Sequence, residues 1–167
     1  MQLNPITRPA PLTRKFPDFA NREDGQRGTD VHSEQPSDGD FVAMLNAYRE
    51  FGGLARAQEV VSMMMADGAP GITTCAQWIV GGNLLSFEWQ SQIWIPLFQF
   101  DRTDMSLQAG IGEILKDLSA TMEPWEQAAW FSQPNLWLAE RCPAELLRAD
   151  RIGVVNAASA TRFLATA

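Results

Sequence analysis

The sequence has 167 residues, of which 46% are hydrophobic, and its six Trp and nine Phe can bury large areas in a small core. The formal net charge of −7 argues against general electrostatic attraction to DNA, RNA or anionic membranes. No apolar stretch is long enough to span a bilayer, and the N-terminus lacks the apolar segment of a secretory signal, so we expect a cytoplasmic protein.

Residues 1–38 differ in composition from the rest of the chain. They hold five of the ten prolines and many charged side chains, but few groups that could fill a core. We therefore predict that 1–38 is a disordered tail. The alternative is a segment that folds on a partner, with Phe16 and Phe19 as anchors.

Apolar residues at helical spacing predict three helices after the tail. They cover residues 41–51, residues 54–66, and a shorter stretch from Thr73 or Thr74 to Val80. Asp38 or Asp40 is placed to cap the first helix.

A β-hairpin is predicted next, with strands over 84–89 and 92–98 and a tight turn at Gln90-Ser91 that lacks the usual glycine. Pro96 places the second strand at a sheet edge or close to its own end.

Helices resume in the last third of the chain. Ile111, Ile114, Leu115 and Leu118 share one face of a helix, and Glu123-Pro124 starts another. Pro143 opens a short helix, and a last helix runs almost to the C-terminus. The predicted fold class is mainly α with one hairpin, divided into the tail 1–38, a helix-turn-helix-like unit 39–100 and a helical domain 101–167.

The residues do not form a pattern typical of an enzyme. The single histidine, His32, lies in the predicted tail, which removes a His-based triad and most zinc sites. The pairs Asp101/Asp104 and Glu123/Glu126 are better explained by turns and a helix start than by catalysis. Cys75 and Cys142 are expected to be free thiols. We therefore predict no catalytic residue, metal or cofactor.

Three helices followed by a hairpin is also the order of a winged helix-turn-helix. In that fold the third helix would read DNA, with Thr73, Thr74 and Gln77 facing a groove. The same helix has no Arg or Lys, whereas DNA affinity depends on phosphate contacts. The alternative is that this unit only packs and forms a homodimer.

The second half of the chain resembles the toxin-binding region of the Xre–MbcA–ParS antitoxin family. In chain order, the segments that carry the resemblance are Trp94-Ile95-Pro96-Leu97-Phe98-Gln99-Phe100-Asp101, Trp125-Glu126-Gln127-Ala128-Ala129-Trp130-Phe131, Pro134-Asn135-Leu136-Trp137-Leu138, Pro143-Ala144-Glu145-Leu146-Leu147 and Val154-Val155-Asn156-Ala157-Ala158.

The resemblance implies an antitoxin that binds and neutralises a RES-type toxin, an enzyme that attacks NAD, and that also represses its own operon. The residues it suggests for toxin contact are Trp130, Pro134, Asn135, Trp137, Leu138, Arg148, Arg151 and Arg162. Trp137 is the strongest candidate, because a Trp in a loop between helices is a common interface anchor.

The chain departs from the family pattern in two places. Many members have a Gly where this chain has Ala139-Glu140-Arg141-Cys142, and its C-terminus lacks the family's Gly-containing finish. The alternatives are a stand-alone transcriptional regulator and an interaction protein on the same scaffold.

Overall fold

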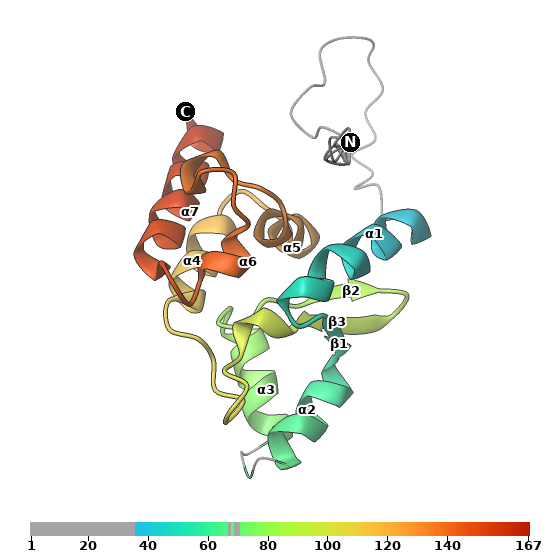
Figure 1. Ribbon diagram of the computed structural model, residues 1–167. Helices are drawn as coiled ribbons and strands as arrows, with labels where there is room; N and C mark the ends of the chain where they lie inside the picture. The colour runs from blue at the N-terminus through green and yellow to red at the C-terminus, as the bar shows by residue number, and fades with distance from the viewer. Residues whose placement is uncertain (1–35, 67, 69–70) are drawn as a thin grey trace, which may run out of the picture. The chain divides into compact units, whose positions relative to one another are not determined.

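The computed structural model describes residues 36–66, 68 and 71–167, and within them the chain is mainly helical with one small antiparallel sheet (Figure 1). This confirms the predicted mainly α fold class. In chain order the elements are α1 (Asp38–Tyr48), the 3-10 helix η1 (Arg49–Phe51), β1 (Leu54–Arg56), α2 (Ala57–Ala66), α3 (Gly71–Val80), β2 (Phe87–Trp89), β3 (Gln92–Pro96), η2 (Leu97–Gln99), α4 (Ile111–Leu118), α5 (Pro124–Ser132), η3 (Leu136–Leu138), α6 (Pro143–Leu146) and α7 (Arg151–Thr166).

Ser37 caps α1, where we had predicted Asp38 or Asp40. Its hydroxyl oxygen accepts a hydrogen bond from the Asp40 N–H (3.3 Å), and the Asp40 carboxylate accepts one from the Ser37 N–H (2.9 Å). This reciprocal pair is a capping box, in which the acidic residue is the third of the helix. Phe16, Phe19 and most of the predicted tail lie outside the described residues, and Asp38 already belongs to α1.

The predicted helix over 54–66 is wrong in its first three residues, because Leu54–Arg56 is strand β1. It pairs with β3, with Ala55 opposite Ile95, and this non-local pairing outweighs the local helical spacing of the apolar residues. Helix α2 begins after it, where the Glu59 carboxylate accepts a hydrogen bond from the Arg56 N–H (2.6 Å). Helix α3 begins at Gly71, before the predicted Thr73 or Thr74.

The hairpin is confirmed, but its strands are shorter than predicted: β2 begins at Phe87, and β3 ends at Pro96, directly before η2. Gln90 and Ser91 both have positive φ, 49° and 58°, as in the two-residue turn that matches the strand twist. The sheet order is β1-β3-β2, so β3 is central and Pro96 lies at its end. Pro96 is tolerated there because the ladder stops at that residue.

The predicted C-terminal helices are present. Glu123 caps α5, Pro124 occupies its first turn, and the Glu126 carboxylate accepts a hydrogen bond from the Glu123 N–H (2.8 Å). Helices α4 and α7 pack against each other beside α6 (Figure 1).

One hydrophobic core joins the segments 39–100 and 101–167, which we had predicted as separate domains. Its members come from α1, the hairpin, η2, α4, α5, η3, α6 and α7. At its centre Tyr48 is fully buried, and its hydroxyl donates a hydrogen bond to the Ala128 carbonyl oxygen (2.6 Å). A smaller cluster around α2 and α3 includes Val60, Met64 and Cys75. Among the described residues, no helix is both long and apolar enough to cross a membrane.

Candidate protein-interaction surface

Residues 134–141, called here the Trp137 turn, connect α5 to α6 and are held in one conformation by local hydrogen bonds. The Asn135 side-chain oxygen accepts a bond from the Trp137 N–H (2.9 Å). Its backbone N–H donates to the Arg141 carbonyl (3.1 Å), and its carbonyl accepts from Leu138 and Glu140 (both 3.0 Å). Asn135 therefore organises both ends of the turn, as expected for a residue that bonds its neighbouring backbone.

The turn separates its three apolar side chains. Leu138 is 6% exposed and belongs to the main core, whereas Leu136 is 83% and Trp137 is 62% exposed. The 3-10 helix that carries them packs against α7. The buried Leu138 thus anchors the turn, and the two exposed side chains are presented by a backbone that is already ordered.

The backbone after Trp137 has the geometry that glycine favours, although no glycine is present. Ala139 has φ 53° and ψ 49°, and Glu140 has φ 63°. Each non-glycine residue in the left-handed region costs about 1–2 kcal/mol. The conformation at Ala139 is therefore one in which a Gly would be relaxed.

The far end of the turn is fixed to α6. The Arg141 guanidinium contacts the Glu145 carboxylate at 2.6 Å, and both side chains are about half exposed. The hydrogen bond from Arg141 lowers the pKa of Glu145. Cys142 follows Arg141 in the sequence, and its thiol donates a hydrogen bond to the Ser132 carbonyl oxygen (3.3 Å). Partial burial raises the pKa of that thiol.

Two of the predicted contact residues tie α7 to its neighbours. Trp130 is half-buried, and its ring nitrogen donates to the Thr161 hydroxyl oxygen (3.2 Å). Arg162 pairs with Asp117 of α4 at 2.9 Å. Both side chains therefore have structural partners within the chain, which sets them apart from Trp137.

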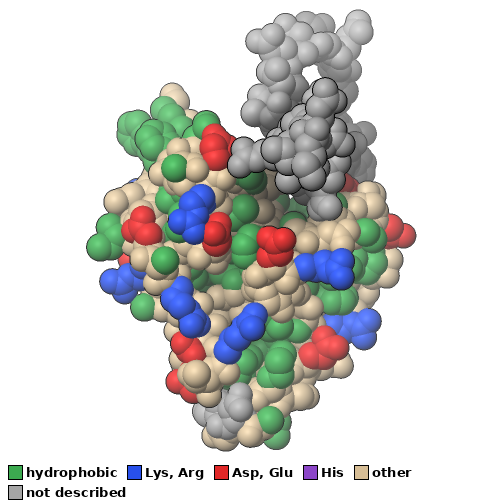
Figure 2. All heavy atoms as spheres, in the orientation of Figure 1, with side chains coloured by type: hydrophobic (Ala, Val, Ile, Leu, Met, Phe, Trp, Pro, Cys, Tyr) green, Lys and Arg blue, Asp and Glu red, His purple; other side chains and the backbone are tan. Residues whose placement is uncertain are grey.

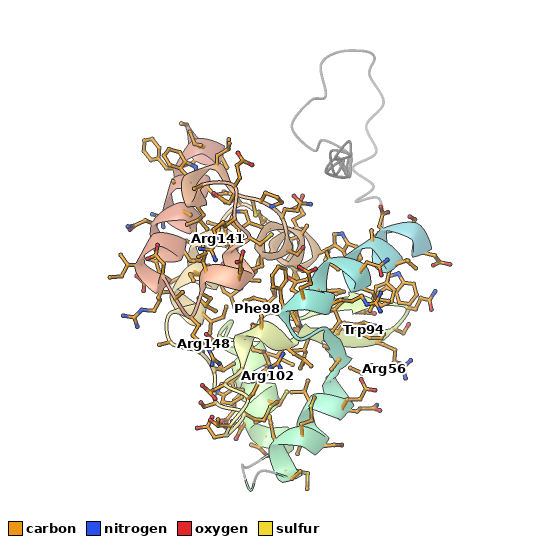
Figure 3. The ribbon with its side chains drawn as sticks, in the orientation of Figure 1. Arg56, Trp94, Phe98, Arg102, Arg141 and Arg148 are labelled. Atoms are coloured by element: carbon orange, nitrogen blue, oxygen red, sulfur yellow. The ribbon has the colours of Figure 1, made fainter. Side chains whose placement is uncertain are left out.

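The other predicted arginines lie near the start of α7 and the loop after η2. Arg148 is paired loosely with Asp101 (3.4 Å), and Figure 3 shows it close to the loop that carries Arg102. Arg151 is exposed and lies against Gly110, where an added Cβ would come within 2.7 Å of its side chain. The exposed Pro134 completes the predicted set.

The residues predicted to read DNA all lie on α3. Thr73 and Gln77 are exposed and share one face, whereas Thr74 is half-buried. Helix α3 contains no Lys or Arg. On the face drawn in Figure 2, Lys and Arg side chains are scattered among Asp and Glu, with no extended basic patch.

The acidic pairs have structural roles. Hydrogen bonds from Thr103 lower the pKa of Asp101, and hydrogen bonds from Ser106 lower that of Asp104, so both carboxylates stabilise the loop turns. Glu123 and Glu126 form the capping box of α5. No group of three or more potential metal ligands occurs within residues 36–66, 68 and 71–167.

At the exposed end of α7, only Arg162 was among the predicted contact residues, and its apolar neighbours Phe163 and Leu164 were not. Phe163 is 70% and Leu164 is 63% exposed, and Figure 2 shows hydrophobic side chains gathered at the upper left, over this end of the helix. The sequence could have indicated their exposure through helical spacing, because the buried residues of α7 are Val154, Ala157 and Ala158, all in the first half of the helix. Residues 163 and 164 lie beyond the part of the helix that packs on the core.

Comparison with known proteins gives no match to a family model, to a curated protein or to a solved structure.

Proposed function

We propose that this protein is an antitoxin-like binding protein, not an enzyme, that neutralises a RES-type NAD-degrading toxin by direct contact. The observation that carries the proposal is the Trp137 turn, which exposes Leu136 and Trp137 on an ordered backbone. The resemblance of residues 94–158 to the Xre–MbcA–ParS family supplies the class of partner.

Energetics favour this turn as the centre of the interface. Trp side chains are enriched among the few residues that carry most binding energy, and such residues are surrounded by contacts that exclude water. A turn that is already ordered loses little conformational entropy on binding. A Trp and a Leu side by side on such a turn suit an apolar pocket on the toxin.

Co-expression with a RES-type toxin tests the proposal. We expect the wild-type chain to restore growth and cellular NAD, and Trp137→Ala to weaken toxin binding by about 2 kcal/mol or more, as truncation of a hot-spot residue does. Val42→Ala is a matched control, since Val42 is also exposed (54%) but lies on α1.

The failing outcomes are distinct. The antitoxin function is contradicted if no RES-type toxin is encoded beside the gene, or if the wild-type chain fails to restore growth against such a toxin with both proteins present. Rescue that survives Trp137→Ala together with Leu136→Ala keeps the function but moves the interface elsewhere. Circular dichroism of each variant separates a binding defect from misfolding.

Autoregulation of the operon is the second candidate function, and it requires a DNA-binding fold. We propose that residues 38–96 form a winged helix-turn-helix, because β1 lies between α1 and α2 and pairs with the later hairpin in the order β1-β3-β2. In that fold α3 is the reading helix and the 90–91 turn is the wing. This also covers the alternative of a stand-alone regulator.

Mobility shifts against the chain's own upstream DNA test this second function. Specific binding that falls with salt, and that weakens on Gln77→Ala, supports it. Binding that is absent at low salt contradicts it and leaves the antitoxin proposal untouched.

A further inference from the structure

The solvent side of α3 is uncharged and largely apolar. Five side chains form this surface, called here the α3 face: Ile72, Thr73, Ala76, Gln77 and Val80. Ile72 is 72% and Val80 is 90% exposed, the latter being the largest exposed fraction of any large hydrophobic residue in the described part of the chain. A shallow depression of about 630 Å³ runs along the same residues and Gly81.

The opposite side of α3 packs against the smaller hydrophobic cluster. The exposed face is therefore the side of the helix that this packing leaves uncovered. Cys75 is 2% exposed and belongs to the smaller hydrophobic cluster with Val60 and Met64. Helix α2 approaches closely, since a Cβ on Gly71 would come within 2.6 Å of the Met65 side chain. Met65 is itself 63% exposed.

Charge restricts what can cover this surface. The chain has 33 charged residues, 13 basic and 20 acidic, yet none lies in α3. A nucleic acid would find no cation there to replace its counterions. A second copy of the chain brings the same neutral surface, so two chains of net charge −7 can meet without burying like charges.

The spacing of the apolar residues is symmetric. Ile72, Ala76 and Val80 are four residues apart and lie on one ridge of the helix. A two-fold axis through Ala76 places Ile72 of one copy against Val80 of the other, which is the self-complementarity that a symmetric dimer needs. The small Ala76 at the crossing permits the interaxial distance of about 8 Å that is the lower end for packed helices.

We propose that the α3 face is the contact surface of a symmetric homodimer, with Ala76 on the two-fold axis. The proposal is independent of the antitoxin function, because it concerns a different surface. It is an alternative to DNA reading by α3, because a dimer formed through this face would cover Thr73 and Gln77. A single pair of crossed helices buries less than the roughly 800 Å² per partner of a standard interface, so we expect a dissociation constant in the micromolar range.

Sedimentation velocity of the full chain between about 1 and 200 µM tests the dimer over the range in which such weak interfaces form. We expect a concentration-dependent shift from monomer to dimer. Ala76→Glu places two carboxylates against each other at the axis and should raise the dissociation constant by about a hundredfold or more. Asn46→Glu is the matched control, because it adds the same charge at an exposed position of α1 and should leave the dimer intact.

Disulfide trapping provides a second readout that does not depend on a disruptive substitution. With Cys142→Ser as background, Ala76→Cys should crosslink to itself under mild oxidation, because only residues near the axis bring their Cα atoms within about 7 Å. Asn46→Cys should form no crosslink, although its dimer stays intact. Cys75 is buried and present in both proteins.

Three results overturn the proposal. One is a monomer up to the highest concentration, as would follow if residues 1–35 or another protein covered the face. Another is a dimer that Ala76→Glu does not weaken. The third is a dimer without the Ala76→Cys crosslink, which decides the matter if the Glu variant fails to fold.

Discussion

The Trp137 turn and the α3 face both expose large apolar side chains, but their backbones differ in kind. The turn is irregular, depends on Asn135 and the buried Leu138, and includes two residues with positive φ. The α3 face belongs to an ordinary helix whose inner side is packed. The difference teaches that a turn can aim two side chains at a pocket, whereas a uniform helix face suits a flat, self-complementary contact.

The largest effect is expected where the turn is anchored. Leu138→Ala removes a buried side chain from the main core and should lower the free energy of unfolding by about 2–5 kcal/mol. Val80→Ala, on the α3 face, should change it by less than about 0.5 kcal/mol because Val80 is exposed. Urea denaturation measures both. Equal changes in the free energy of unfolding would contradict the difference between a buried Leu138 and an exposed Val80.

Asn135→Ala tests the hydrogen bonds that hold the turn. Losing the hydrogen bond that the Trp137 N–H donates to the Asn135 side-chain oxygen should cost about 1 kcal/mol, as for other helix caps, and should make residues 136–138 exchange their amide hydrogens faster. Asn46→Ala is the control, since Asn46 is exposed on α1 and its side chain makes no hydrogen bond to another described residue. Unchanged amide exchange in the turn would show that Leu138 alone orders it.

The same substitution should have opposite signs in the two regions. Ala139→Gly relaxes a residue with φ 53° and should stabilise the protein by about 0.5–1 kcal/mol. Ala76→Gly, inside an exposed stretch of α3, should destabilise it by about 1 kcal/mol. Thermal unfolding at a concentration where the chain is monomeric compares them. Destabilisation by both would argue that the strain at Ala139 is absent in solution.

The smallest effect is a pH dependence from the Arg141–Glu145 pair, which joins the turn to α6. Arg141 lowers the folded-state pKa of Glu145 below its usual 4.5, so the pair stabilises the folded chain above that pH and the contribution is lost as the pH falls through the lowered value. The stability difference between wild type and Glu145→Gln should therefore shrink on acidification and also in high salt, because the pair is half exposed. If this stability difference grew as the pH fell, it would contradict a stabilising Arg141–Glu145 pair. Helix α3 has no acidic or basic side chain to give such a signal.

The hairpin and the C-terminal helices followed from the sequence because their signals are local. Apolar spacing at Ile111, Ile114, Leu115 and Leu118 indicated α4, and Glu123-Pro124 indicated the start of α5. The turn at Gln90-Ser91 was predicted from two flanking strand patterns even without a glycine. The role of Asn135 in its turn was also readable, because an Asn after a Pro bonds backbone within a few residues.

Strand β1 could not be predicted in the same way. Leu54–Arg56 has no strand signal of its own, and only pairing with β3, some 40 residues later, decides its conformation. The single core that joins 39–100 with 101–167 depends likewise on contacts such as Tyr48 to Ala128, which are 80 residues apart.

By itself the sequence determined the helices, the hairpin and the position of a Trp-containing turn, because helix periods, caps and turn residues act over a few residues. Only the tertiary structure decided that Leu138 is buried while Trp137 is not, and that α3 leaves an uncharged face uncovered. Exposure is a property of the whole packed chain. It depends on which distant element covers a side chain, and no local pattern contains that information.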